Sequence, residues 1–134
     1  PRYEFISRTG ADLPKNLFYL GPKSPEQVNG IVKSSLLLVH TCSTEEGFGN
    51  SFIQAWLQGK PTVSLYFDPH SIITRNSLGY ISESMEQMRR DVKHLIEDPA
   101  LRSEMGARAR NFSQQQFNIE NNIKVLENFF SSIL

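Results

Sequence analysis

An acidic, glycine-rich segment, residues 45–50, separates an apolar run from a helical pattern. It reads Glu-Glu-Gly-Phe-Gly-Asn, and its two glycines, Gly47 and Gly49, allow a ligand to approach the backbone closely. The first amides of a helix have no partner within the helix, and the helix dipole adds about half a positive charge there. Such junctions bind anions, so the segment predicts a site for a phosphate or diphosphate group.

Two side chains of this region suit a ligand that is rich in hydroxyl groups. Glu46 lies ahead of the predicted helix and Gln54 lies about one turn inside it, so both can face the same crevice. A carboxylate accepts hydrogen bonds from neighbouring sugar hydroxyls, and a primary amide both donates and accepts. The spacing also fits a simpler interpretation, in which Gly47 and Gly49 only shape a turn and Gln54 is an ordinary surface residue.

The neighbouring elements predict a βαβ unit around this segment. Residues 36–39 are apolar on both faces, which is typical of a central parallel strand covered by helices. A helix over about residues 50–58 follows, and residues 62–67 form the next strand. A right-handed crossover places residues 45–50 at the carboxyl edge of the sheet, where open α/β folds bind ligands. The loop at Phe67–His70 reaches the same edge and fits either a pocket wall or a plain turn.

The rest of the chain completes an α/β pattern that ends in helices. Tyr3–Ile6 and Leu17–Leu20 are predicted strands, and Ser24 with Gln27 predicts a capped helix start. Three amphipathic helices follow Ser84, and we expect them to serve packing, with their basic residues on solvated faces. Their apolar positions are Met85, Met88, Val92, Leu95 and Ile96; Leu101, Met105 and Phe112; and Ile119, Ile123, Leu126, Phe130 and Ile133.

Composition narrows the class of protein. The chain has 134 residues, 39% hydrophobic and 21% charged, which suits one compact domain over residues 1–134. Fourteen basic residues balance fourteen acidic ones, so a nucleic-acid partner is not expected. The single cysteine, Cys42, cannot form an internal disulfide, and no spacing of His and Cys predicts a metal site, so we expect a cytoplasmic protein without a metal. The chain starts without methionine and is expected to be part of a longer one.

A resemblance sharpens the interpretation of residues 45–63. Glu46-Gly47-Phe48-Gly49, then Gln54-Ala55, then Gly59-Lys60-Pro61-Thr62-Val63 resembles the Glu-x7-Glu signature of the retaining family 4 (group 1) glycosyltransferases. Residues 16–21 are similar to the strand before that family's switch-point helix, and residues 98–110 to its closing helical segment. The resemblance covers most of the chain. It implies a Rossmann-like parallel sheet flanked by helices, which is the nucleotide-sugar-binding C-terminal half of a two-domain GT-B enzyme.

The resemblance also implies roles for particular residues. Glu46 corresponds to the catalytic first glutamate, which contacts hydroxyls of the donor sugar. Gln54 stands where the family has a second glutamate for the ribose, and an amide still fits a diol. The implied donor-binding residues are Gly47, Phe48, Gly49, Asn50, Gln54, Ser43, Thr44, Leu20 and Gly21.

The family's pattern predicts what this chain lacks. The first strand and helix of the family's domain, which carry a basic clamp for the diphosphate, have no counterpart before Tyr3. The acceptor-binding N-terminal domain is also absent, so the chain alone is expected to be inactive. The implied partners are a nucleotide sugar, with no metal, and that missing domain. Peripheral membrane association is expected only through the full-length enzyme, which would serve polysaccharide or glycolipid biosynthesis.

Two other functions remain open from the sequence. One is a non-catalytic module that binds a nucleotide or a protein on the same scaffold, with Gln54 marking the loss of transfer. The other is a different GT-B enzyme, such as a sugar-nucleotide epimerase, against which the spacing of Glu46 and Gln54 speaks.

Overall fold

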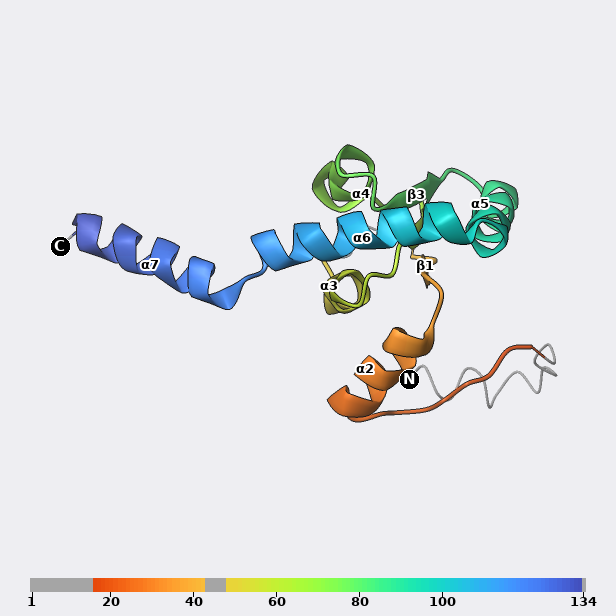
Figure 1. The fold of residues 1–134 in the computed structure, drawn as a ribbon, viewed down its shortest axis with the longest axis horizontal. Helices are drawn as coiled ribbons and strands as arrows, with labels where there is room; N and C mark the ends of the chain where they lie inside the picture. Colours follow the sequence, from red (N-terminus) through yellow and green to blue (C-terminus); the bar gives the residue numbers. More distant parts are fainter. Residues whose placement is uncertain (1–15, 43–47, 134) are drawn as a thin grey trace.

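The computed structural model describes residues 16–42 and 48–133 and contains a parallel β-sheet with helices on both faces (Figure 1). Its strands are β1 (Leu38–His40), β2 (Thr62–Leu65) and β3 (Gly79–Ser82), in the order β1-β2-β3. The helices are α2 (Pro25–Ser34), α3 (Asn50–Leu57), the short 3-10 helix η1 (Pro69–Ser71), α4 (Ile72–Arg75), α5 (Met85–Glu97), α6 (Pro99–Gln116) and α7 (Ile119–Ile133). The predicted α/β class and the βαβ unit are confirmed.

The central strand of the described sheet is β2, not the strand that the sequence favoured. All four residues of β2 are buried, whereas Leu36 and Val39 are 49% and 44% exposed. Only Leu38 and Val39 of the apolar run 36–39 belong to a strand, β1, which pairs only with β2 among the described strands and therefore lies at the edge of the described sheet. In the described sheet the predicted central position belongs to β2 instead of β1, because apolar residues show which strand avoids water, not how many strands lie beside it.

The predicted strand Leu17–Leu20 is not formed. The structure places these four residues in an irregular segment ahead of α2, and all four are exposed. An apolar run becomes a strand only when a neighbouring strand takes its backbone hydrogen bonds, and none of the described strands does so here. The predicted strand Tyr3–Ile6 lies outside the described residues.

Two apolar clusters fill the two faces of the sheet. On one face, Phe52 and Trp56 of α3 pack with Ile73, Leu78 and Ala109. The cluster on the other face consists of Val63, Leu65, Met88, Leu95 and Met105. Because Met105 and Ala109 both belong to α6, this long helix contributes to both clusters and ties α3 to α5.

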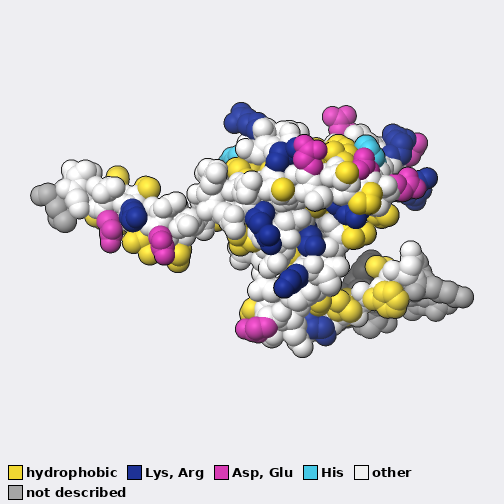
Figure 2. Space-filling model, in the orientation of Figure 1, with side chains coloured by type: hydrophobic (Ala, Val, Ile, Leu, Met, Phe, Trp, Pro, Cys, Tyr) yellow, Lys and Arg dark blue, Asp and Glu magenta, His cyan; other side chains and the backbone are white. Residues whose placement is uncertain are grey.

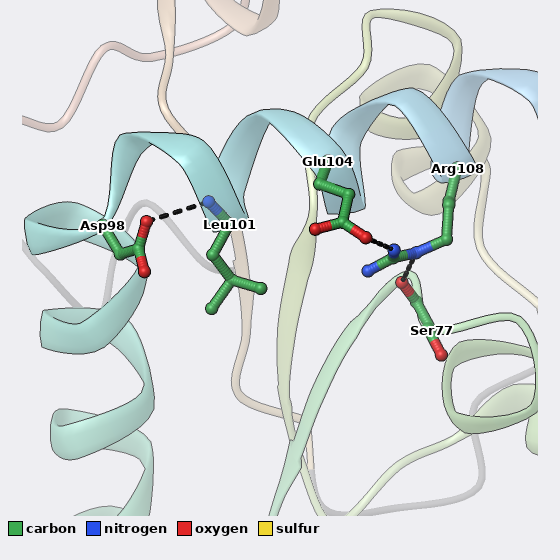
Figure 3. A network of polar contacts seen from close by, with 5 residues as sticks. All are labelled: Ser77, Asp98, Leu101, Glu104 and Arg108. Atoms are coloured by element: carbon green, nitrogen blue, oxygen red, sulfur yellow. Dashed lines mark hydrogen bonds and ion pairs between the residues drawn. The ribbon is translucent and has the colours of Figure 1, made fainter.

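Arginines of α6 secure this arrangement by donating to backbone carbonyls. Arg102 donates to two carbonyls in the last turn of α5, at 2.6 and 3.0 Å, and Arg110 donates to the last carbonyl of α3 at 3.1 Å. Arg108 pairs with Glu104 and donates to the Ser77 carbonyl at 3.0 Å (Figure 3). Carbonyls at the ends of helices have no intrahelical partner, so these side chains complete the neighbouring elements. The prediction placed the basic residues of α6 on solvated faces, whereas the structure shows that they also hold neighbouring elements through these carbonyls.

The last helix, α7, forms as predicted but does not pack. None of its residues is buried, and Figure 1 shows it extending away from the sheet beyond α6. Its apolar side chains, from Ile119 to Ile133, are exposed, and some of them are visible as hydrophobic surface in Figure 2. The prediction of packing was wrong for the described residues. No described helix is long and apolar enough to cross a membrane.

The contact between α3 and α6 yields a stability prediction. A Cβ atom on Gly106 would lie 2.2 Å from the carbonyl oxygen of Gly59, which is far inside van der Waals contact. We expect Gly106→Ala to lower the free energy of unfolding by about 1–3 kcal/mol, because the two helices must separate. Chemical denaturation of the two proteins measures this difference.

The matched control for that substitution is Gly30→Ala in α2. A Cβ there meets no atom within 4 Å, so only helix propensity changes, and stability should rise by about 0.5–1 kcal/mol. Equal effects of the two substitutions would contradict the proposed close approach of α3 and α6.

Candidate functional site

The carboxyl ends of the three strands meet at one edge of the sheet. The register pairs His40 with Ser64 and Leu65 with Ser82, so β1, β2 and β3 end side by side. The segment after β1 leads into α3, and the segment after β2 leads into η1 and α4. Open parallel sheets bind ligands at such an edge.

Only some of the predicted site residues can be located. Phe48, Gly49, Asn50 and Gln54 lie together at the start of α3. The predicted residues Ser43, Thr44, Glu46 and Gly47 lie outside the described residues. Leu20 and Gly21 precede α2, which Figure 1 shows below the sheet. The structure therefore brings four of the ten predicted residues together at a helix N-terminus.

The aromatic ring of Phe48 fixes the entry to α3. Its centroid lies 5.5 Å from that of Phe117, 5.7 Å from that of Trp56 and 6.0 Å from that of Phe52. Rings at these separations pack as a cluster, and Phe48 is only half-buried because it lies at the rim of the core. The side chain of Phe48 thus anchors the loop to the core.

The N-terminus of α3 differs from those of the longer helices that the structure describes. Side chains of Ser24, Ser84 and Asp98 accept hydrogen bonds from first-turn amides of α2, α5 and α6; the Asp98 bond is drawn in Figure 3. Asn118 accepts from two amides of α7. By contrast, α3 begins after Gly49, which has no side chain to cap it, and its first turn carries no acidic residue. Its first amides can therefore serve a bound anion.

Glycine at position 49 is not demanded by the backbone. Its φ of −80° and ψ of 144° are open to any residue, and among the described residues an added Cβ would meet only the Ser51 hydroxyl at 3.5 Å, an ordinary contact. What glycine provides at this position is an open helix end. A side chain there would cover the first amides.

Asn50 and Gln54 occupy one face of α3, because residues four apart in a helix lie above one another. Phe52, Ala55 and Trp56 bury the opposite face, which leaves Asn50 exposed and Gln54 half-buried. Two amide side chains therefore line the helix on the side that does not enter the core. They can donate to and accept from hydroxyl groups.

A hydrogen-bonded chain through Ser64 was not predicted from the sequence. The Ser64 hydroxyl donates to the carbonyl of Phe67 at 2.6 Å, and its oxygen lies 3.3 Å from Nδ1 of His40. Since the hydroxyl has a single proton, Nδ1 of His40 must be the donor in the second bond. The His40 ring also lies 4.8 Å from the ring of Phe52 and 5.6 Å from that of Phe67. These contacts join the ends of β1 and β2 to the first turn of α3.

The sequence feature that could have indicated these hydrogen bonds is a serine inside a buried strand. A hydroxyl in the core needs a partner, so Ser64 in the otherwise apolar carboxyl half of β2 called for one. Sequence spacing could not name His40, which is 24 residues earlier. No group of His, Cys, Asp and Glu side chains within the described residues could hold a metal ion.

The described part of the chain is thus an α/β domain with a parallel sheet, in which Gly49 gives α3 no side-chain cap. A sequence profile of the glycosyl transferases group 1 matches residues 7–112, so the chain belongs to this family. It is 27% identical over 128 residues to an uncharacterized glycosyltransferase of Methanocaldococcus jannaschii, an alignment that covers 93% of this chain and 33% of that protein.

A solved structure shows the same fold. The crystal structure of Anabaena Alr3699/HepE in complex with UDP matches with a TM-score of 0.79 and 20% identity, covering 98% of this chain and 36% of that one. This likeness confirms the α/β fold expected of a GT-B glycosyltransferase. The chain spans about a third of the length of both relatives.

The hydrogen bonds of the Ser64 hydroxyl yield a second stability prediction. Ser64→Ala removes two hydrogen bonds, one from His40 Nδ1 and one to the Phe67 carbonyl, and at about 0.5–1.5 kcal/mol each they contribute about 1–3 kcal/mol together. We expect the free energy of unfolding to fall by that amount in chemical denaturation. Ser103→Ala, at an exposed position of α6, is the control and should change it by less than about 0.5 kcal/mol. If the two variants are equally stable, the hydrogen bonds of Ser64 do not stabilise the ends of β1 and β2.

Proposed function

We propose that this chain is the donor-binding part of a glycosyltransferase that moves a sugar from a nucleoside-diphosphate sugar to an acceptor. The observation that carries this proposal is the uncapped N-terminus of α3 at the carboxyl edge of the sheet, where a diphosphate can accept hydrogen bonds from backbone amides. Membership of the glycosyl transferases group 1 supports it. The UDP in the Anabaena structure supports a nucleoside diphosphate as the ligand.

The site residues divide between the sugar and the nucleotide in this proposal. Glu46 binds hydroxyls of the reacting sugar, and Gln54 binds the ribose. Asn50 and the amides that follow Gly49 bind the diphosphate, and the loop residues Ser43, Thr44 and Gly47 close around it. These roles rest on the resemblance to family 4 glycosyltransferases and, for Gln54 and Asn50, on their shared face of α3.

The finer assignment follows the same resemblance. We assign the enzyme to family 4 as a hexosyltransferase that acts in the cytoplasm, without a metal, and retains the anomeric configuration. Its acceptor is held by an N-terminal domain that this chain does not include, and the matched relatives are about three times as long as the chain. This chain alone therefore binds the donor weakly and transfers no sugar.

The carrying observation is tested by capping α3. In Gly49→Asp the new carboxylate would accept hydrogen bonds from the first amides of α3 and would repel a diphosphate. The stability of the protein should rise by about 1 kcal/mol, and its affinity for UDP should fall by more than about tenfold. Binding is measured by titrating the 134-residue chain with UDP at millimolar concentrations and following the amide NMR signals of Asn50 and Ser51.

Gly49→Asn separates the two effects of the cap. Asparagine occupies the same amides without a charge, so its affinity for UDP should lie between those of the wild type and the aspartate variant. UDP binding that is equal in all three proteins would place the diphosphate elsewhere and overturn the proposal.

The roles of Glu46 and Gln54 predict different kinetic defects in the longer enzyme. Glu46→Gln removes a charge-assisted bond to the reacting sugar, which costs about 1.5–3 kcal/mol and lowers kcat about ten- to a hundredfold. Gln54→Glu acts on the ribose, remote from bond breaking, so it should change KM for the donor more than kcat. Steady-state kinetics with varied donor decides between these roles. An unchanged rate in Glu46→Gln, or a collapse of kcat confined to Gln54→Glu, would mean that the two roles are wrongly assigned.

A further inference from the structure

The chain reverses sharply at Tyr66, directly after the central strand β2. The amide of Tyr66 still pairs with β3, donating to the Ser82 carbonyl at 2.9 Å. The next amide, that of Phe67, donates back to the Leu65 carbonyl at 2.8 Å and closes a three-residue turn around Tyr66. Tyr66 has a φ of +61°, so the turn belongs to the rare, strained form in which the central residue has a positive φ.

This strain is imposed by contacts on both sides of the turn. The Phe67 carbonyl accepts from the buried Ser64 hydroxyl, and the Phe67 ring lies 6.0 Å from the ring of Phe52. Farther along, Asp68 accepts from the amide of Ile73 at 2.9 Å. Because the chain is held before and after Tyr66, the fold fixes the backbone conformation from which its side chain extends.

The residue type at this position does not serve the fold. Glycine and asparagine adopt a positive φ most readily, whereas a bulky side chain there is strained. The Tyr66 side chain is also 56% exposed, so burial offers little compensation. Strained residues that the surroundings hold in place are concentrated at ligand sites.

The place of Tyr66 suggests which ligand it meets. Tyr66 directly follows β2, the strand next to β1, and its neighbour Phe67 packs against Phe52 in the first turn of α3. That turn carries the open amides proposed above for the diphosphate. A tyrosine ring offers a flat apolar face and a hydroxyl, which suit a ring with a polar rim.

We propose that Tyr66 is a binding residue that packs against a ring of the nucleotide sugar, either the base or the glycosyl ring, at the carboxyl edge. This inference rests on the proposed function and extends it to a residue outside the 45–54 segment. The predicted pocket wall at Phe67–His70 then acts mainly as the support of Tyr66, since Phe67 and Asp68 are the parts that anchor it.

Substitution by asparagine separates strain from binding. Tyr66→Asn keeps a residue that tolerates the positive φ but removes the ring, so the midpoint of thermal unfolding should be unchanged or higher. Affinity for the ligand should fall about threefold to tenfold. Tyr66→Phe keeps the ring and should retain affinity within about twofold. Binding of UDP and of UDP-glucose to the 134-residue chain is measured by NMR titration.

The matched control is Ser77→Asn. Ser77 has a φ of +52° and is exposed, but it precedes β3 and so lies at the opposite edge of the sheet. This variant should likewise keep or raise the midpoint, and it should leave the affinities unchanged.

Each outcome bears on the inference. Weaker binding of both ligands in Tyr66→Asn supports contact with the base, and weaker binding of UDP-glucose alone supports contact with the glycosyl ring. Unchanged affinities, or a midpoint lowered by more than about 4 °C, would overturn the inference while UDP shifts at Asn50 and Ser51 still upheld the proposed function. If neither ligand binds the wild-type chain, both proposals fail.

Discussion

The burial of β2 on both faces is the constraint on which the rest of the described structure depends. Its alternating residues point to different helices: Val63 and Leu65 enter the cluster with α5, and Thr62 and Ser64 face α3. The two polar residues need partners in the core, since an unpaired buried hydroxyl is costly. Thr62 accepts from the indole of Trp56 at 3.0 Å, and Ser64 joins His40 to the turn after the strand. The strand β2 thereby sets the position of α3, and with it the place of the α3 N-terminus at the carboxyl edge of the sheet.

The sequence predicted those parts of the fold that depend on local signals. The capping box at Ser24, the helix after Gly49 and the strand from Thr62 all form, because caps, glycines and apolar periodicity act over a few residues. The order of the strands and the exposure of α7 could not be predicted in this way. Both depend on which distant segments lie alongside, which a run of apolar residues does not encode.

For the candidate site, too, the sequence predicted local features but not the contacts between distant residues. The sequence proposed an anion site at the start of α3 from its glycines and from the free amides of a helix start, and the structure adds that α2, α5 and α6 are capped by side chains. The contributions of Ser64 and Tyr66 were not apparent, because one is a contact across 24 residues and the other a backbone angle. The residues with the most chemistry, around Glu46, lie outside the described part of the chain, so their roles rest on resemblance.

The exposed apolar face of α7 affects how the protein behaves in concentrated solution. The formal net charge is zero at pH 7, so little electrostatic repulsion opposes contact between molecules at neutral pH. The exposed side chains of Ile123, Leu126 and Phe130 then form an apolar surface through which molecules can associate. Concentrated samples are best kept well away from the isoelectric point near pH 7.4, where like charges keep the molecules apart.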